Sequence, residues 1–256
     1  MTARIAAAIA SVAVATTLVG CTGFYEIPVE TPIQAKIDIS GFQRVLVAGF
    51  LSGGSQAIDA NSETARLLRS QLRTRQDLRV IDADALPLLD AVDKRLGTKP
   101  PAPPAPGAPA EPRIRDEKDL ETYAAIFKDA EFWKKIGSEY ESPLIVTGSV
   151  LFTEISRSGV VSRPQSIVNQ QGLEEYRSVR AYSDMKGFAL TPRFVFIDGR
   201  TGAELYSESY HEETLYPATQ NTPALSSYFE LMDKLLPGFL NTLSTQKIRG
   251  SRVLIN

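Results

Sequence analysis

The chain has 256 residues, of which 43% are hydrophobic and 23% are charged, a balance that supports a folded core and excludes global disorder. Its formal net charge of −2 gives none of the strongly basic character expected of a nucleic-acid-binding protein. The single cysteine excludes an intramolecular disulfide.

The first twenty residues have the pattern of a bacterial export signal. Arg4 supplies a positive start, and the uncharged residues 5–20 are fewer than the about 20 that a membrane-spanning helix needs. Leu18, Val19, Gly20 and Cys21 then resemble the lipobox of bacterial lipoproteins. The resemblance implies signal cleavage between Gly20 and Cys21, and lipid on Cys21 with acyl chains such as palmitate, which would hold the protein stably on a membrane. An uncleaved anchor or a chance cysteine is the alternative.

Thr22 bears on the membrane that the anchor would enter. Inner-membrane lipoproteins of this kind carry aspartate at that position, so the resemblance favours the outer membrane, with the protein facing the periplasm. The sequence does not decide whether the membrane is the inner or the outer one. We expect residues 1–20 to be the signal peptide, residues 21–35 a tether broken by Pro28 and Pro32, and residues 36–256 a single domain.

The first half of that domain predicts alternating strands and helices. The predicted elements are a buried strand at 44–50, a loop at 51–55, a helix from Ser62 to Leu72, a strand at 78–82, and a helix at 84–96 with Pro87 in its first turn. Residues 97–113 are a proline-rich insertion, with seven prolines between 100 and 112. Such a segment favours extended or irregular backbone, and it is either a docking segment or a tolerated surface insertion.

The second half predicts a long helix at 116–136 that ends at Gly137 and buries Trp133, then strands at 144–152, 188–197 and 203–213. Residues 198–202 have hairpin chemistry. A last helix at 223–245 should kink or split at Pro237-Gly238. The predicted fold is therefore α/β (α+β): a mixed sheet of about five strands with helices packed on it, an antiparallel hairpin near the C-terminal part and a long C-terminal helix.

Three stretches carry a resemblance to a known family. They are residues 44–82, residues 142–150 with a strand that ends in glycine, and residues 194–205 with the turn Asp198-Gly199-Arg200-Thr201-Gly202. They are similar to the periplasmic lipoprotein domains related to CsgG, the curli secretion lipoprotein, and more loosely to the amino-terminal domain of TolB and to the LpoB activators. The resemblance implies an envelope α/β domain.

One departure from that family concerns the secretion pore, whose subunits each donate two membrane hairpins. Residues 156–186 could replace one hairpin, but they contain charges such as Arg157, Arg163, Glu174 and Arg180. A membrane strand needs about ten residues of alternating apolar pattern. Since no second hairpin is evident, the expectation is the fold and the envelope location without the pore.

The residues give little support for catalysis. His211 is the sole histidine, and the neighbouring Glu208, Glu212 and Glu213 form no known motif. A zinc site would need more His or Cys ligands than the chain offers, and no cofactor is expected. Residues 52–55 lack the glycine spacing and the Gly-Lys of a phosphate loop, and Asp82 and Asp84 fit a strand end and a helix cap.

Three hypotheses follow for the function. The first is a non-catalytic interaction or assembly domain, held in the periplasm by lipid on Cys21, with an envelope protein or another copy of itself as partner and no nucleic acid. The second is an oligomeric export component closer to CsgG. The third is an envelope hydrolase, for which the sequence offers no triad.

Overall fold

The computed structural model describes residues 24–75, 77–96, 113–168 and 172–255. The predicted signal peptide, Cys21 and the proline-rich residues 97–112 lie outside these ranges. Contacts divide the chain into two compact units, residues 36–243 and residues 1–35 with 244–256. The sheet and the helices that carry the core belong to residues 36–243.

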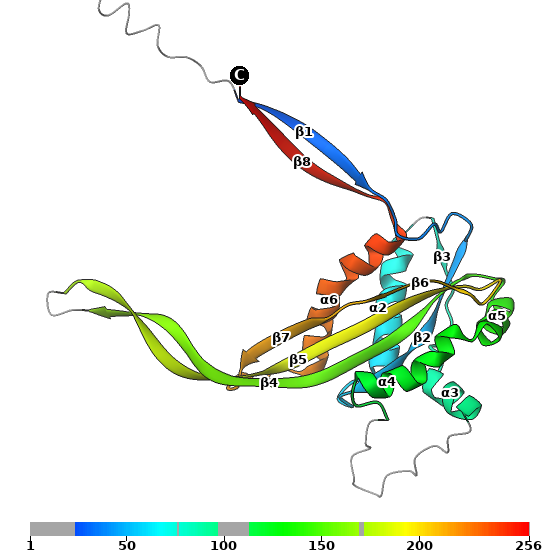
Figure 1. Ribbon diagram of the computed structural model, residues 1–256, viewed down its shortest axis with the longest axis horizontal. Helices are drawn as coiled ribbons and strands as arrows, with labels where there is room; N and C mark the ends of the chain where they lie inside the picture. Colours follow the sequence, from blue (N-terminus) through cyan, green and yellow to red (C-terminus); the bar gives the residue numbers. More distant parts are fainter. Residues whose placement is uncertain (1–23, 76, 97–112, 169–171, 256) are drawn as a thin grey trace, which may run out of the picture. The chain divides into compact units, whose positions relative to one another are not determined.

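A mixed sheet runs through residues 36–243 (Figure 1). Its strand order is β3 (Arg79–Val80), β2 (Arg44–Gly54), β4 (Leu144–Val168), β5 (Glu174–Asp198) and β6 (Glu204–Ser209), and β7 (Glu212–Pro217) also pairs with β5. The β3–β2 and β2–β4 pairs are parallel, whereas β5 pairs antiparallel with β4, β6 and β7. The α/β prediction is confirmed, and the described residues form six strands in this sheet where about five were expected.

Helices cover both faces of this sheet. One face packs against α2 (Ala60–Arg73) and α6 (Ala224–Leu243). The other packs against α3 (Leu88–Leu96), α4 (Glu117–Tyr123), the 3-10 helix η1 (Ala124–Lys128) and α5 (Ala130–Glu139). Successive side chains of β4 enter opposite layers, Ile145 with Trp133 and Val146 with Phe239. Residues 144–152 therefore lie in a central strand, as predicted, and Trp133 is a core residue.

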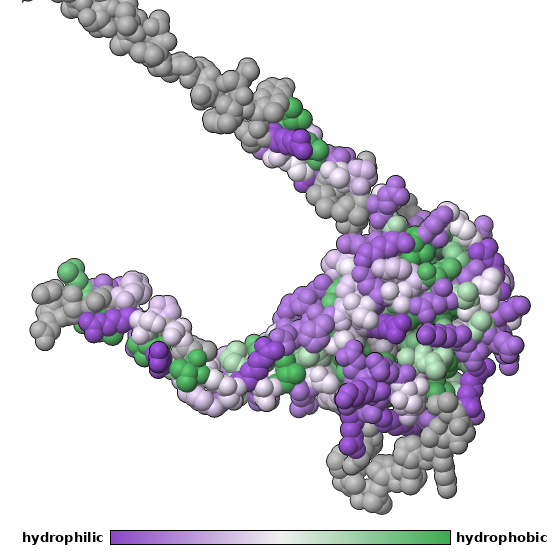
Figure 2. All heavy atoms as spheres, in the orientation of Figure 1, coloured by the Kyte–Doolittle hydropathy of each residue, from purple (hydrophilic) through white to green (hydrophobic). Residues whose placement is uncertain are grey.

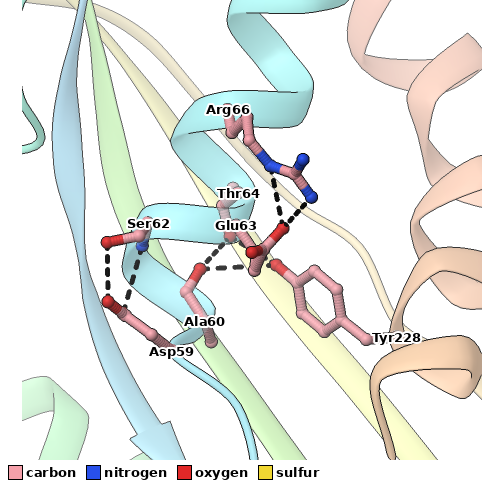
Figure 3. A network of polar contacts seen from close by, with 7 residues as sticks. All are labelled: Asp59, Ala60, Ser62, Glu63, Thr64, Arg66 and Tyr228. Atoms are coloured by element: carbon pink, nitrogen blue, oxygen red, sulfur yellow. Dashed lines mark hydrogen bonds and ion pairs between the residues drawn. The ribbon is translucent and has the colours of Figure 1, made fainter.

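Polar contacts tie the start of α2 to α6 (Figure 3). The Asp59 carboxylate accepts the Ser62 backbone N–H at 3.1 Å and caps the helix. Inside the layer, the Tyr228 hydroxyl from α6 meets the Thr64 hydroxyl and lies 3.4 Å from the Ala60 carbonyl. Both hydroxyls are fully buried, so these bonds replace the water that each has lost. The sequence predicted that this helix begins at Ser62, whereas α2 begins at Ala60 with Asp59 as its cap.

Close backbone approaches explain two corrections. Residues 51–54 were expected in a loop, but they extend β2 along β4, where a Cβ on Gly53 would lie 2.5 Å from Ile114. The helix predicted at 116–136 is broken at Asp129, whose side chain accepts the Phe132 N–H and starts a new helix. Gly137, predicted to end the helix, lies inside it, and only glycine fits there because a Cβ would lie 1.9 Å from the Gly199 carbonyl oxygen.

Proline explains two further differences. The helix predicted from residue 84 begins at Leu88, so Pro87 precedes the helix and Asp84 does not cap it. The last helix runs through Pro237 without splitting. Both Pro237 and Asp233, whose carbonyl loses its usual donor, lie on the exposed side of α6, where water can satisfy that carbonyl. No described helix has the length and hydropathy to cross a membrane.

The hairpin at 198–202 is confirmed, but the strand after it is shorter than predicted. Gly202 N–H donates to the Asp198 carbonyl at 2.7 Å, and β6 pairs antiparallel with β5. The predicted strand at 203–213 divides at residues 210 and 211 into β6 and β7, which pair with separate stretches of β5. The strand is broken there because β6 pairs with residues 193–197 of β5, whereas β7 pairs with residues 185–190 of the same strand.

The second unit is a two-stranded antiparallel ribbon in its described part. β1 (Phe24–Ile33) pairs with β8 (Gln246–Ile255) over the whole length of both strands. Residues 24–33 of the predicted tether thus form β1, and residues 246–255 of the predicted domain form β8. Pro28 and Pro32 are compatible with β1 because each strand of a two-stranded ribbon has an unpaired edge, and residues four apart turn their nitrogens to the same side.

Candidate interaction surface

A long β-ribbon extends from the sheet, made by the outer halves of β4 and β5. The two strands have 25 residues each and pair antiparallel along their full lengths. The other partner of β4, β2, ends opposite Phe152, and β7 reaches along β5 only to Met185. Residues 157–168 and 174–184, called the ribbon below, therefore lie beyond the strands that flank them. At 3.4 Å per residue the ribbon is about 40 Å long.

The ribbon exposes large apolar and aromatic side chains. Val160 and Tyr182 lie directly opposite each other and are 66% and 69% exposed, and Tyr176 on the same face is 73% exposed. Figure 2 shows hydrophobic and hydrophilic residues interspersed along this part of the chain. Aromatic and arginine side chains that are large, exposed and close together are typical of protein interaction surfaces.

Charges occupy both faces of the ribbon. Arg180 lies on the face of Tyr176 and Tyr182, whereas Arg157 and Arg177 lie on the opposite face, because side chains alternate along a strand. Arg157 also pairs with Glu213 of β7 at 2.8 Å. Neither face is a continuous apolar band. The arrangement fits a water-exposed binding element better than a strand pair immersed in lipid.

Both outer edges of the ribbon are open among the described residues. No described strand pairs with β4 beyond Phe152 on the β2 side, or with β5 beyond Met185 on the β7 side. An open edge presents unpaired N–H and C=O groups, to which a further strand can add. The ribbon thus combines two features of a binding site, exposed aromatic residues and available backbone groups.

The candidate catalytic residues of the sequence are not brought together. His211 Nδ1 lies 2.8 Å from the Thr191 hydroxyl on the sheet, and Glu213 is paired with Arg157. Asp82 is 81% exposed and pairs with Arg73 at 3.1 Å. Asp82 follows β3, whereas His211 and Glu213 lie beside β5, and each makes a surface ion pair or a single hydrogen bond.

Residues 52–55 have the structural role of extending and ending a strand. Gly54 N–H donates to the Ile114 carbonyl at 2.8 Å, and Gly54 has φ of 85°, which glycine adopts easily. The start of α2 that follows is already capped by the Asp59 carboxylate, so its positive end faces a negative group of the chain itself. This geometry does not favour a phosphate site.

A polar cluster lies where the chain enters and leaves residues 36–243. Lys36 forms an ion pair with Glu208, whose carboxylate also accepts the Tyr210 hydroxyl at 2.8 Å and the Thr242 hydroxyl at 3.3 Å. Burial raises the pKa of Glu208, but the hydrogen bonds from Lys36 and Tyr210 outweigh it and leave that pKa below its ordinary value. Burial raises the pKa of Tyr210 to about 12. The cluster holds the first and last residues of the unit together.

The ribbon is the feature that sequence reasoning missed. Residues 156–186 were weighed as a hairpin and set aside because of their charges. The available signal was the polar run Asn169-Gln170-Gln171-Gly172 midway between two stretches rich in Val, Ser, Tyr and Arg. Turn residues between two strand-forming stretches predict a hairpin whether or not a membrane is present.

No protein-family model and no curated protein matches this chain. Among solved structures, the chain is similar to the crystal structure of lipoprotein GNA1162 from Neisseria meningitidis, with 13% sequence identity, a TM-score of 0.34, and coverage of 79% of this chain and 99% of that one. The resemblance to CsgG-related domains stays a prediction.

Proposed function

We propose that this protein is a lipid-anchored envelope lipoprotein that acts as a non-catalytic interaction or assembly domain. The observation that carries the proposal is the ribbon: an extension about 40 Å long with open edges and exposed Tyr176 and Tyr182, joined to a sheet whose faces are covered by helices. The anchor rests on the lipobox at Cys21, and outer-membrane placement on Thr22 after it.

The anchor is tested by Cys21→Ser. Wild-type cells labelled with a fatty-acid analogue should mark the protein, and the variant should stay unlabelled and either become soluble or stall as the precursor. Thermal melting of both purified proteins, measured alongside, separates a loss of lipid from a loss of fold. Equal labelling of both proteins would refute lipidation at Cys21.

The interaction role is tested by photo-crosslinking in intact cells. A photoreactive residue at Tyr182 should crosslink to a defined partner, either an envelope protein or a second copy, identified by mass spectrometry. The matched control is the same residue at Leu225 on α6, which is 43% exposed and far from the ribbon in sequence. Equal crosslinking at both positions, or none at Tyr182, would contradict the ribbon as the interaction element.

An oligomeric export component is the second candidate, and the length of the ribbon favours it. Strands of 9 to 11 residues are long enough to cross a bilayer. The charges on both faces count against it. Ring-shaped particles in negative-stain images of the purified lipoprotein would support this candidate over the first.

A further inference from the structure

The two open edges of the ribbon differ in their backbone groups. Ala218 N–H donates to the Asp184 carbonyl at 2.8 Å, and Tyr210 N–H donates to the Pro192 carbonyl at 2.9 Å. Both carbonyls therefore point away from β4. Since backbone direction alternates along a strand, the even-numbered residues of β5 in the ribbon, Ser178 among them, point their N–H and C=O groups to the open edge.

This pattern shows which of the two edges lacks a backbone donor and so pairs less well with a further strand. Pro164 of β4 lies directly opposite Ser178, whose backbone points outward. Such a pair shares no backbone hydrogen bonds, so the Pro164 nitrogen faces the open edge of β4, where it supplies no donor. Residues 174–184 of β5 contain neither proline nor glycine. The β5 edge can thus accept a full strand, whereas the β4 edge is interrupted.

We propose that the open edge of β5 pairs antiparallel with the same edge of a second copy of this chain, with Ser178 on the twofold axis. The proposal rests on the ribbon being the interaction element of the proposed function, and it names the partner. A twofold interface must be self-complementary: where a residue of one copy faces a given residue of the other, the same pair recurs on the other side of the axis. The charges of the edge select the register that satisfies this condition.

With Ser178 opposite itself, residues 174–182 pair with residues 182–174 of the partner. Tyr176 then faces Arg180 twice, a favourable cation–π pair, and Glu174 faces Tyr182. No two like charges are directly opposed. This register uses nearly all of the open segment and forms about ten main-chain hydrogen bonds.

Neighbouring registers of similar length bring like charges together. An axis at Arg180 would place that arginine against its own copy. An axis at Val179 would place Glu174 opposite Asp184 twice. Like charges directly across a strand pair are destabilising, so the axis at Ser178 is favoured. The interface is smaller than a standard stable one, and the dissociation constant should lie in the micromolar range.

The experiment uses cysteine crosslinking in the full chain carrying Cys21→Ser, so that an introduced thiol is the only one. Ser178→Cys should form a disulfide-linked dimer under mild oxidation, because opposed residues in such a pair have Cα atoms about 5.5 Å apart. The matched control is Ser162→Cys, also exposed on the ribbon but in β4, which should remain monomeric. Equal dimer from both variants, or none from Ser178→Cys, overturns the proposal.

A second variant tests the edge without a thiol. Ser178→Pro removes an outward donor and leaves the β4–β5 ladder intact, so its melting temperature should match that of the wild type. In sedimentation at up to about 100 µM the wild type should dimerise and Ser178→Pro should not. A monomeric wild type, a ring or an unaffected variant refutes the twofold pairing. If Tyr182 nevertheless crosslinks to another envelope protein in cells, the proposed function stands and this inference alone fails.

Discussion

The two halves of β4 belong to one strand but have opposite environments. Residues 144–152 lie between β2 and β5 with helices over both faces, and Leu144, Ile145 and Val146 are fully buried. Residues 157–168 keep only β5 as neighbour, and Val160 is 66% exposed. The inner half stabilises the fold through buried apolar surface, while the outer half leaves its apolar surface and backbone groups available.

The comparison implies that equal substitutions in the two halves have unequal effects. Val146→Asp would bury an unpaired carboxylate in the central strand and should destabilise the protein by about 3 kcal/mol or more. Val160→Asp, in the exposed half, should change the free energy of unfolding by less than about 0.5 kcal/mol. Urea denaturation followed by circular dichroism measures both. Similar losses of unfolding free energy in the two variants would contradict the difference between the buried and the exposed half of β4.

A substitution at Glu208 tests whether contacts with residues distant in sequence make this charge important for stability. On sequence alone, Glu208→Lys would be nearly silent on an exposed strand. The structure gives this carboxylate contacts with Lys36, Tyr210 and Thr242, so the change should cost about 1–2 kcal/mol. Chemical denaturation of the purified variant measures it, and a variant as stable as the wild type would show that the cluster contributes nothing.

The same carboxylate gives a pH dependence. Its folded pKa lies below the ordinary value of 4.5, so its contribution to stability is present above pH 4.5 and is lost as the pH falls below it. Glu208→Gln should lose less stability than the wild type between neutral and acid pH. Denaturation midpoints at a series of pH values provide the comparison, and parallel curves would exclude the effect.

Shortening the ribbon should affect partner binding and leave the fold nearly unchanged. Residues 158–184 can be replaced by Asn-Gly, which turns tightly between Arg157 and Met185, an opposed pair whose backbone groups face each other. The free energy of unfolding should change by less than about 1 kcal/mol, because the ribbon lies outside the packed layers. Crosslinking to partners should be lost. Marked destabilisation, seen by thermal melting, would mean that the ribbon supports the core.

The proline-rich segment should give the smallest effect. Deletion of residues 100–112 with a short Gly/Ser link should shift the melting temperature little, because loop-closure entropy changes slowly with length. Arg113, which pairs with Asp93 at 2.8 Å, is retained in this deletion. A large shift would show that the deleted residues pack against the fold.

Local patterns predicted the elements that are buried on one or both sides. The apolar run at 144–152 and the stripe of α6 indicate burial, because buried positions need apolar side chains at a fixed period. The hairpin at 198–202 was indicated by its Asp and Gly residues. The order of these elements was enough for the α/β class. The resemblance of residues 18–21 to a lipobox also came from the sequence, because such a motif does not depend on folding, and lipid on Cys21 stays a prediction.

Tertiary structure decided what depends on partners distant in sequence. The pairing of β1 with β8 joins residues 24–33 to residues 246–255, and Glu208 gained its role from Lys36 and Thr242. The length of β4 and β5 was hidden because a strand pair without packed faces has no apolar period to reveal it. The edge of β5 is open because β7 ends opposite Met185, and the residues of the edge itself do not predict where β7 ends.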